Sequence, residues 1–367
     1  MPQLEQLNAQ LDRLAAFDAG PFPVVSLYLN LQADDRGRDR FEQFLRKELS
    51  ERVRTYAAAG PERESLHKDA DRVESYMHDV AKTANGLAIF ACSGAGLFEA
   101  IQLAASPIGD HRVYISDQPH LYPLARLLDE YPRYMVLLAD THSARIFVFA
   151  ANTIERDDRI EGVKTKHHKM GGWSQARYQR HTENYHLHHA KEVIDAVIRI
   201  VHEDGIDRIV ISGDDVIVPL LREQLPKDVA ERVIKVVSIA KHASERDVFH
   251  TTIAALREND AETDRERVDA LLDAYRANGL ACVGLEQTRH AFELGQVDEL
   301  VITTRPDTIT GVKHAAGDRQ PDRTAEERAA DELIAQARNT SANIRFIEDA
   351  SRLAPVGGVG AFLRFKI

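Results

Sequence analysis

Residues 164–181, KTKHHKMGGWSQARYQRH, combine residue types that can hold a polyanion. No Asp or Glu occurs between Val163 and Thr182, although the whole chain has a formal net charge of -11. Lysine and arginine release counterions from a phosphate backbone, and aromatic rings stack on unpaired bases. The stretch contains the basic residues and the two aromatic residues Lys164, Lys166, Lys169, Trp173, Arg177, Tyr178 and Arg180. It therefore predicts a local contact with a polyanion, and a solvated surface loop is the alternative.

Two adjacent glycines, Gly171 and Gly172, lie at the centre of this basic stretch. Glycine adopts backbone angles that are closed to other residues, and it lets another backbone approach closely. Strand-like sequence precedes the stretch and a helical pattern follows it. We therefore expect a loop, held between a sheet and a long helix, that can project a main-chain amide away from the protein.

The composition is that of a soluble protein with more than one domain. A chain of 367 residues predicts two or three domains, and an apolar share of 44% is ordinary for a soluble globular protein. Cys92 and Cys282 lie far apart in apolar runs, so neither a disulfide framework nor a zinc cluster is predicted. The sequence contains no secretory leader and no apolar run that could cross a bilayer. We expect a cytoplasmic protein with no membrane partner.

Sequence motifs for cofactors and for nucleophilic hydrolysis are missing from the chain. Cys92 is followed by SGAG at 93–96, but the Lys-Ser/Thr of a phosphate-binding loop does not follow, and the SGAG run predicts a turn. No Gly-x-Ser-x-Gly sequence is present. The sequence therefore predicts no cofactor, and it does not favour a hydrolase of the usual nucleophilic kind.

Strands and helices alternate along the chain, which is typical of an α/β protein with several small sheets. Strands are predicted at residues 24–31, 86–92, 134–140, 144–150, 208–212, 233–239, 297–303, 343–347 and 361–367. Helices are predicted near the N-terminus and at residues 40–56, 64–83, 183–202, 245–277 and 324–337. A polar step, DEYPR, at 129–133 and a helix stop, ANGL, at 277–280 suggest boundaries. The predicted domains are residues 1–130, 131–277 and 278–367.

The stretch GGWSQARYQR at 171–180 resembles a motif of one family. Class-1 peptide chain release factors of eukaryotes and archaea, with their bacterial and Pelota-like relatives, carry a loop of the outline Lys-x-x-x-x-Gly-Gly-Gln-Ser-x-x-Arg-Phe-x-Arg before a long helix. Both glycines, Ser174, Arg177, an aromatic Tyr178 and Arg180 fall in register with it. Other segments resemble the family in the same order, namely VVSLYLNL at 24–31, RIVISG at 208–213, LEQTRHAFELGQVDEL at 285–300 and GGVGAFLRF at 357–365.

This resemblance implies three small α/β domains in a tRNA-like arrangement, with the ribosome and its RNA as partners. The N-terminal domain would face the decoding centre, and the middle loop would reach the peptidyl-transferase centre. There ribosomal RNA would be bound by Lys164, Lys166, Lys169, Trp173, Arg177, Tyr178 and Arg180. The C-terminal domain would bind a translational GTPase or another partner. It also implies that Gly171, Gly172 and Gln175 take part in hydrolysis of peptidyl-tRNA, by orienting water and by stabilising developing charge with a backbone amide.

The chain departs from the family pattern at two places. Trp173 occupies the glutamine position, and the nearest glutamine is Gln175. The Asn-Ile-Lys-Ser motif for reading stop codons does not occur in residues 1–130. The missing stop-codon motif favours rescue of stalled ribosomes, or protection of idle ones, over routine termination. Trp173 leaves two possibilities open, namely a rearranged loop that presents Gln175 for hydrolysis and a loop that has lost hydrolysis. We expect rescue by peptidyl-tRNA hydrolysis. The alternatives are a non-catalytic factor that occupies and protects the ribosome in hibernation, and an RNA-binding protein that acts away from the ribosome.

Two further groups of residues are candidates for other roles. The cluster His181, His186, His188 and His189 could hold a metal ion only with a third convergent ligand, so we predict RNA contacts below neutral pH and no metal. The run SGDD at 212–215 could suggest a carboxylate pair for a metal. We interpret it instead as the end of a strand and the cap of the next helix.

Overall fold

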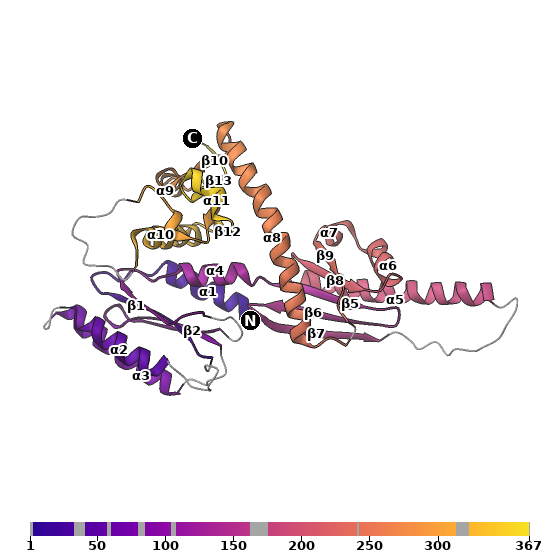
Figure 1. The fold of residues 1–367 in the computed structure, drawn as a ribbon, viewed down its shortest axis with the longest axis horizontal. Helices are drawn as coiled ribbons and strands as arrows, with labels where there is room; N and C mark the ends of the chain where they lie inside the picture. The colour runs from indigo at the N-terminus through magenta and orange to yellow at the C-terminus, as the bar shows by residue number, and fades with distance from the viewer. Residues whose placement is uncertain are drawn as a thin grey trace. The chain divides into compact units, whose positions relative to one another are not determined.

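A computed structural model describes residues 3–32, 41–56, 60–79, 85–103, 108–161, 175–240, 242–312 and 323–366. The chain divides into two compact units. The first, which we call the end unit, combines Met1–Tyr131 with Thr263–Ile367, and the second, the middle unit, is Pro132–Glu262. The described residues form three sheets with helices on them, which confirms the predicted α/β class (Figure 1). Within the described residues, no helix is long and apolar enough to cross a membrane.

The N-terminal part of the end unit is an antiparallel sheet in the order β3-β2-β1-β4. Its strands are β1 (Val24–Asn30), β2 (Gly86–Cys92), β3 (Leu97–Leu103) and β4 (Arg112–Ser116). Its helices are α1 (Gln3–Ala15), α2 (Phe41–Val53), α3 (Pro61–Asp79) and α4 (Tyr122–Glu130). Alternate residues of β1, such as Val25 and Leu27, pack with Leu45 of α2 and Leu66 of α3. These two helices therefore cover one face of the sheet (Figure 1).

The C-terminal part of the end unit has a sheet in the order β10-β13-β11-β12. Its strands are β10 (Ala281–Val283), β11 (Val297–Thr303), β12 (Asn343–Ile347) and β13 (Val359–Leu363), and its helices are α9 (Leu285–Glu293), α10 (Ala325–Asn339) and α11 (Ala350–Leu353). The turn before β13 has a backbone conformation that requires glycine. Gly358 has φ +78, and a Cβ there would meet the Thr308 carbonyl oxygen at 2.9 Å. The predicted glycine turn and final strand are confirmed, although the strand begins and ends earlier than predicted.

Buried charges join the N-terminal and C-terminal parts of the end unit. Asp331 of α10 is 2% exposed, and its Oδ2 lies 2.7 Å from Nδ1 of His120. The other oxygen accepts a hydrogen bond of 2.8 Å from the backbone N–H of Tyr122. Arg323, also buried, donates to Asp331 and to Ser116 Oγ. The carboxylate thus links segments more than two hundred residues apart.

The middle unit contains a five-stranded sheet in the order β7-β6-β5-β8-β9. Its strands are β5 (Tyr134–Ala139), β6 (Ser143–Ala150), β7 (Thr153–Glu161), β8 (Ile209–Gly213) and β9 (Val233–Val237). Its helices are α5 (Gln175–Asp204), α6 (Ile217–Gln224) and α7 (Lys227–Ala230), and α8 (Glu245–Arg276) begins here and ends in the end unit. Met135 faces the core formed with Val193 of α5, whereas the neighbouring Tyr134 hydroxyl contacts Thr252 of α8. Helices therefore cover both faces of this sheet.

The turn after β2 is held by a buried carboxylate. Ser93–Ala95 form a short 3-10 turn that ends at Gly96, with φ 79, as the sequence predicted. Asp69 of α3 has no exposed surface, and its Oδ1 accepts hydrogen bonds from the backbone N–H and the hydroxyl of Ser93, at 2.7 and 2.6 Å. Its Oδ2 has no hydrogen-bond partner. Burial raises the pKa of the Asp69 carboxyl, against the opposing effect of the Ser93 hydrogen bonds.

Replacing Asp69 with asparagine should flatten the pH dependence of stability. The pKa of this carboxyl is higher in the folded protein than in the unfolded chain, where it is about 4. The wild type therefore loses stability as the pH rises from about 4 through the pKa of the folded state. Asp69→Asn keeps an acceptor for Ser93 but carries no charge, so this loss should disappear. Asp69→Ala also removes the acceptor and should cost about 1–3 kcal/mol. Denaturant unfolding at pH 4 and pH 7, followed by circular dichroism, measures both effects, and an unchanged pH profile in Asp69→Asn would refute the assignment.

Candidate functional site

The basic stretch connects an edge strand to a long helix of the middle unit. Strand β7 ends at Glu161, and α5 begins at Gln175. Residues 162–174 lie outside the described part of the chain. They include the predicted loop glycines and RNA contacts Gly171, Gly172, Lys164, Lys166, Lys169 and Trp173. Their roles therefore stay predictions.

Helix α5 begins at Gln175, well before residue 183, where the sequence pattern predicted its start. Gln175 is its first residue, and Arg177, Tyr178 and Arg180 lie within its first two turns. The first turn contains no acidic residue. A helix N-terminus carries partial positive charge and has free backbone N–H groups, so basic residues there are unfavourable and an anion is favourable. A phosphate group bound at the start of α5 would therefore be favourable.

The beginning of α5 extends beyond the sheet on which the rest of the helix packs, as Figure 1 shows. The α5 residues of the hydrophobic core run from Ala190 to Val201. They repeat with helical spacing, and they pack against the buried faces of β5, β6 and β8. The apolar end of the helix fixes its direction, and the basic end projects.

Aromatic and imidazole rings gather where α5 leaves the sheet. The ring of His186 lies 6.1 Å from that of His142, in the turn between β5 and β6, and 6.3 Å from that of Tyr185. His189 is 2% exposed, and neither of its ring nitrogens has a hydrogen-bond partner. Burial lowers the pKa of His186, and the neighbouring His142 and His189 lower it further, against the opposing charge of Asp214. His186 is therefore neutral near pH 7.

The predicted histidine cluster is only partly brought together. His188 is exposed, and its Nδ1 lies 3.5 Å from Glu192, away from the buried His189. The side chain of His181 lies outside the described part. Where side chains are described, no three His, Cys, Asp or Glu residues are arranged to hold a metal ion.

A cavity of about 650 Å³ lies at the carboxyl ends of β5 and β8, and Glu161, the last residue before the basic loop, lines it. Two aspartates line this cavity. Asp140 Oδ1 accepts from the backbone N–H groups of the following turn, at 2.7 and 2.8 Å. Asp214 Oδ1 accepts from those of Val216 and Ile217, at 2.9 and 2.8 Å. The predicted strand end in SGDD is confirmed, because β8 ends at Gly213. Asp214 binds the turn that leads into α6, but the N-cap residue of that helix is Val216, which makes no side-chain capping bond. The carboxylates of Asp140 and Asp214 thus both stabilise turns.

Comparison with known proteins gives two family matches. Residues 119–257 match "Bacterial archaeo-eukaryotic release factor family 10", and residues 262–367 match "eRF1 domain 3". An uncharacterized protein of Mycobacterium tuberculosis is 26% identical over 267 residues, which cover 69% of this chain and 71% of that protein. Peptide chain release factor subunit 1 of Thermococcus onnurineus is 23% identical over 419 aligned positions, which cover 100% of this chain and 98% of that protein.

Solved structures include one described as "Model of ribosome-bound archaeal Pelota and ABCE1". It is 14% identical, covers 99% of this chain and 94% of that chain, and superposes with a TM-score of 0.43. This TM-score is too low to support a relationship, and the similarity to release factors rests on the sequence matches.

Proposed function

We propose that this chain enters the acceptor site of the ribosome. The chain belongs, as a bacterial member, to the superfamily of the archaeal and eukaryotic class-1 peptide chain release factors and Pelota-like proteins. One observation carries the proposal. The basic Gly-Gly stretch directly precedes a long helix whose first residue is Gln175 and whose first turn contains no acid. Such an arm suits a tunnel with walls of RNA phosphate.

The proposed reaction at the tip of this arm is hydrolysis of peptidyl-tRNA. A water oxygen attacks the ester carbonyl carbon, the bond from that carbon to the terminal ribose oxygen breaks, and the ribose oxygen leaves with a proton. A backbone N–H next to Gly171 and Gly172 would stabilise the negative charge on the carbonyl oxygen. The Gln175 side chain would orient the water, so the protein supplies positioning and no nucleophile.

The remaining parts of the chain have supporting roles in this proposal. Residues 1–130 would face the decoding centre, residues 131–277 would carry the loop, and residues 278–367 would bind a translational GTPase. The first and third of these segments form one compact unit. Together they would position the loop-bearing unit on the ribosome.

A second candidate function is occupancy of the ribosome without hydrolysis, as in hibernation. Trp173 favours it, because a large aromatic residue stands where the family places its catalytic glutamine. An indole can stack on an unpaired base of ribosomal RNA and add affinity. In that case Trp173→Ala would weaken ribosome binding more than Gln175→Ala does.

The salt dependence of ribosome binding tests the proposed role of the basic loop. Replacing Lys164, Lys166 and Lys169 with alanine should lower the slope of log K against log salt concentration by about 2–3, because each lysine that neutralises a phosphate contributes about 0.7–0.9. The matched control replaces Lys47, Lys68 and Lys227, which are exposed on other helices, and should change the slope little. Co-sedimentation with ribosomes at increasing salt measures it. Equal slopes in both triple variants, or binding that tRNA in the acceptor site does not compete with, would refute the proposal.

A further inference from the structure

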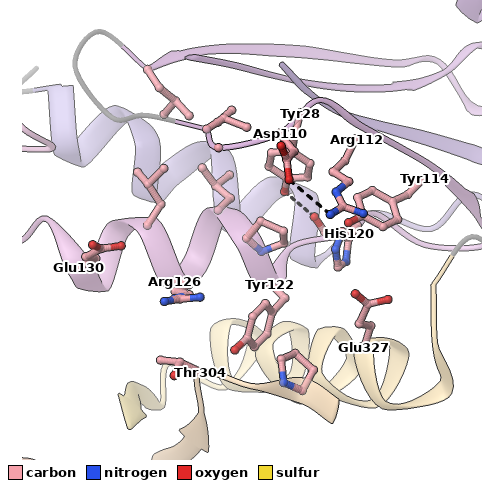
Figure 2. A pocket seen from close by; sticks show the side chains of 17 residues that line it. Tyr28, Asp110, Arg112, Tyr114, His120, Tyr122, Arg126, Glu130, Thr304 and Glu327 are labelled. Carbon is pink, nitrogen blue, oxygen red and sulfur yellow. Dashed lines mark hydrogen bonds and ion pairs between the residues drawn. The ribbon is translucent and has the colours of Figure 1, made fainter. Parts of the chain in front are cut away.

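The end unit contains a cavity of about 440 Å³ between α4 and the C-terminal part (Figure 2). Its walls come from both ends of the chain. Tyr28 and Tyr114 come from β1 and β4, Tyr122 from α4, and Thr304 and Glu327 from the segment after β11 and from α10. The volume lies within the range of small-molecule sites. None of the residues that line this cavity belongs to the basic stretch, and no role in the proposed function uses it.

The tyrosine hydroxyls of Tyr28 and Tyr122 already have partners. Tyr28 donates to the His120 carbonyl oxygen at 2.5 Å, and Tyr122 donates to the Thr303 carbonyl oxygen at 2.9 Å. The ring of Tyr114 lies 4.2 Å from the ring of His120, so it is held in place by packing. These side chains therefore offer fixed aromatic surfaces to a ligand rather than polar groups.

The hydrogen-bond donors of the arginines that line the cavity have fewer close acceptors than the tyrosine hydroxyls. The side chain of Arg126 is 40% exposed, but its Nε is buried and has no hydrogen-bond partner, and the guanidinium is charged at every physiological pH. The outer nitrogen of Arg126 lies 3.6 Å from Glu348, too far for a hydrogen bond. Arg112 has a contact of the same length, 3.6 Å, to Asp110. A buried donor without an acceptor is costly, so Arg126 points to an anion that this cavity accommodates.

Carboxylates limit what kind of anion can bind here. Asp110, Glu130 and Glu327 also line the cavity. In Figure 2 the side chains of Arg126 and Tyr122 extend from α4 and that of Glu327 from α10 toward the space between the helices. A ligand with several negative charges would be repelled by these acids, whereas one with a single phosphate and several N–H donors would match both sets of groups.

We propose that this cavity binds a nucleotide with a single phosphate. The base would stack against Tyr114, as bases do on aromatic side chains, and its N–H groups would donate to the carboxylates. The phosphate would accept from the Nε–H of Arg126. The nucleotide is either free in solution or a single residue of unpaired RNA, since both sources present the same base and phosphate.

Calorimetric titration of the full chain, without ribosomes, tests the proposal. The probes are AMP, GMP, ribose 5-phosphate and an unstructured RNA hexamer. We expect AMP or GMP, or the hexamer if the source is RNA, to bind at least tenfold more tightly than ribose 5-phosphate, which lacks a base. Arg126→Ala should weaken this binding roughly ten- to hundredfold. Arg126→Lys, which keeps the charge but not the Nε–H, should give a smaller loss.

The control is Arg276→Ala, since Arg276 is exposed in the last turn of α8 and pairs with the neighbouring, exposed Asp273 in a contact of 3.2 Å. It should bind the same probes as the wild type. Loss of binding in Arg126→Ala with an unchanged circular dichroism spectrum supports the site. Absence of binding by all four probes, or equal binding of AMP and GMP to the wild type and to Arg126→Ala, would overturn it. The latter result with the hexamer alone would assign the RNA contact to the basic loop.

Discussion

Replacing Gln175 with alanine is expected to lower peptide release about 10²- to 10³-fold while ribosome binding stays unchanged. The reason is that Gln175 is proposed to act on the attacking water and not on the ground state, and losing one positioned polar group in such a site has an effect of this size. The measurement is release of labelled peptide from ribosomes that hold peptidyl-tRNA, together with co-sedimentation of each variant.

The matched control for this result is Gln179→Ala, one helical turn further along α5. It removes the same side chain from the same helix and should leave peptide release unchanged. Equal losses in the two variants would mean that the helix, and not Gln175, supports the reaction. Release that persists in Gln175→Ala would remove Gln175 from the mechanism.

Replacing Asp331 with alanine should lower the free energy of unfolding of the end unit by about 3–5 kcal/mol. The change removes the buried counter-charge of the Arg323 guanidinium, which is 3% exposed and then faces the exposed Asp117 at 3.9 Å. It also leaves the Tyr122 backbone N–H without an acceptor. Removing one partner of a buried ion pair carries a cost of this size. Denaturant unfolding of the full chain, followed by circular dichroism, measures it.

An exposed aspartate provides the control for Asp331. Asp273 pairs with Arg276 at 3.2 Å, and both side chains are largely exposed. Asp273→Ala should therefore cost less than about 1 kcal/mol. A similarly small cost for Asp331→Ala would mean that the buried charges do not hold the two parts of the end unit together.

Several strands of the end unit could be predicted from the sequence because their apolar residues alternate or follow one another without a break. Strand β2 of the end unit and β11 and β12 of its C-terminal part have the bounds that the sequence predicted. Strand β2 is buried at every residue, which explains its unbroken apolar pattern. The apolar run identifies such a strand, and the flanking glycine and polar residues mark where it begins and ends.

The edge strands β7 and β10 were missed, whereas the edge strands β9 and β12 were predicted. Strand β7, TIERDDRIE, lies at the edge of the middle sheet, and its residues alternate between exposed and half-buried. Its side chains are mostly charged, so apolar periodicity gave no signal. Strand β10 has only three residues. The start of α5 was also missed, because its first two turns have no apolar stripe and their helical state depends on the rest of the helix.

Residue types identified the candidate RNA-binding stretch, but sequence could not give the contacts that assemble distant segments. The pair of His120 and Asp331 joins residues 211 positions apart, and neither residue stands in a recognisable motif. The same holds for the cavity lined by Tyr114 and Arg126, whose walls meet only because the two ends of the chain fold into one unit. Such sites arise from tertiary contacts, which a local pattern does not contain.

Peptide release by the wild-type protein tests the central claim most directly. The assay uses ribosomes with labelled peptidyl-tRNA, prepared once with an empty acceptor site and once with that site filled by tRNA. The account predicts binding and peptide release on the first preparation, and loss of both on the second. Binding without release on the empty-site ribosomes would contradict hydrolysis and assign the protein to occupancy, and release that continues with a filled acceptor site would contradict the proposed site of entry.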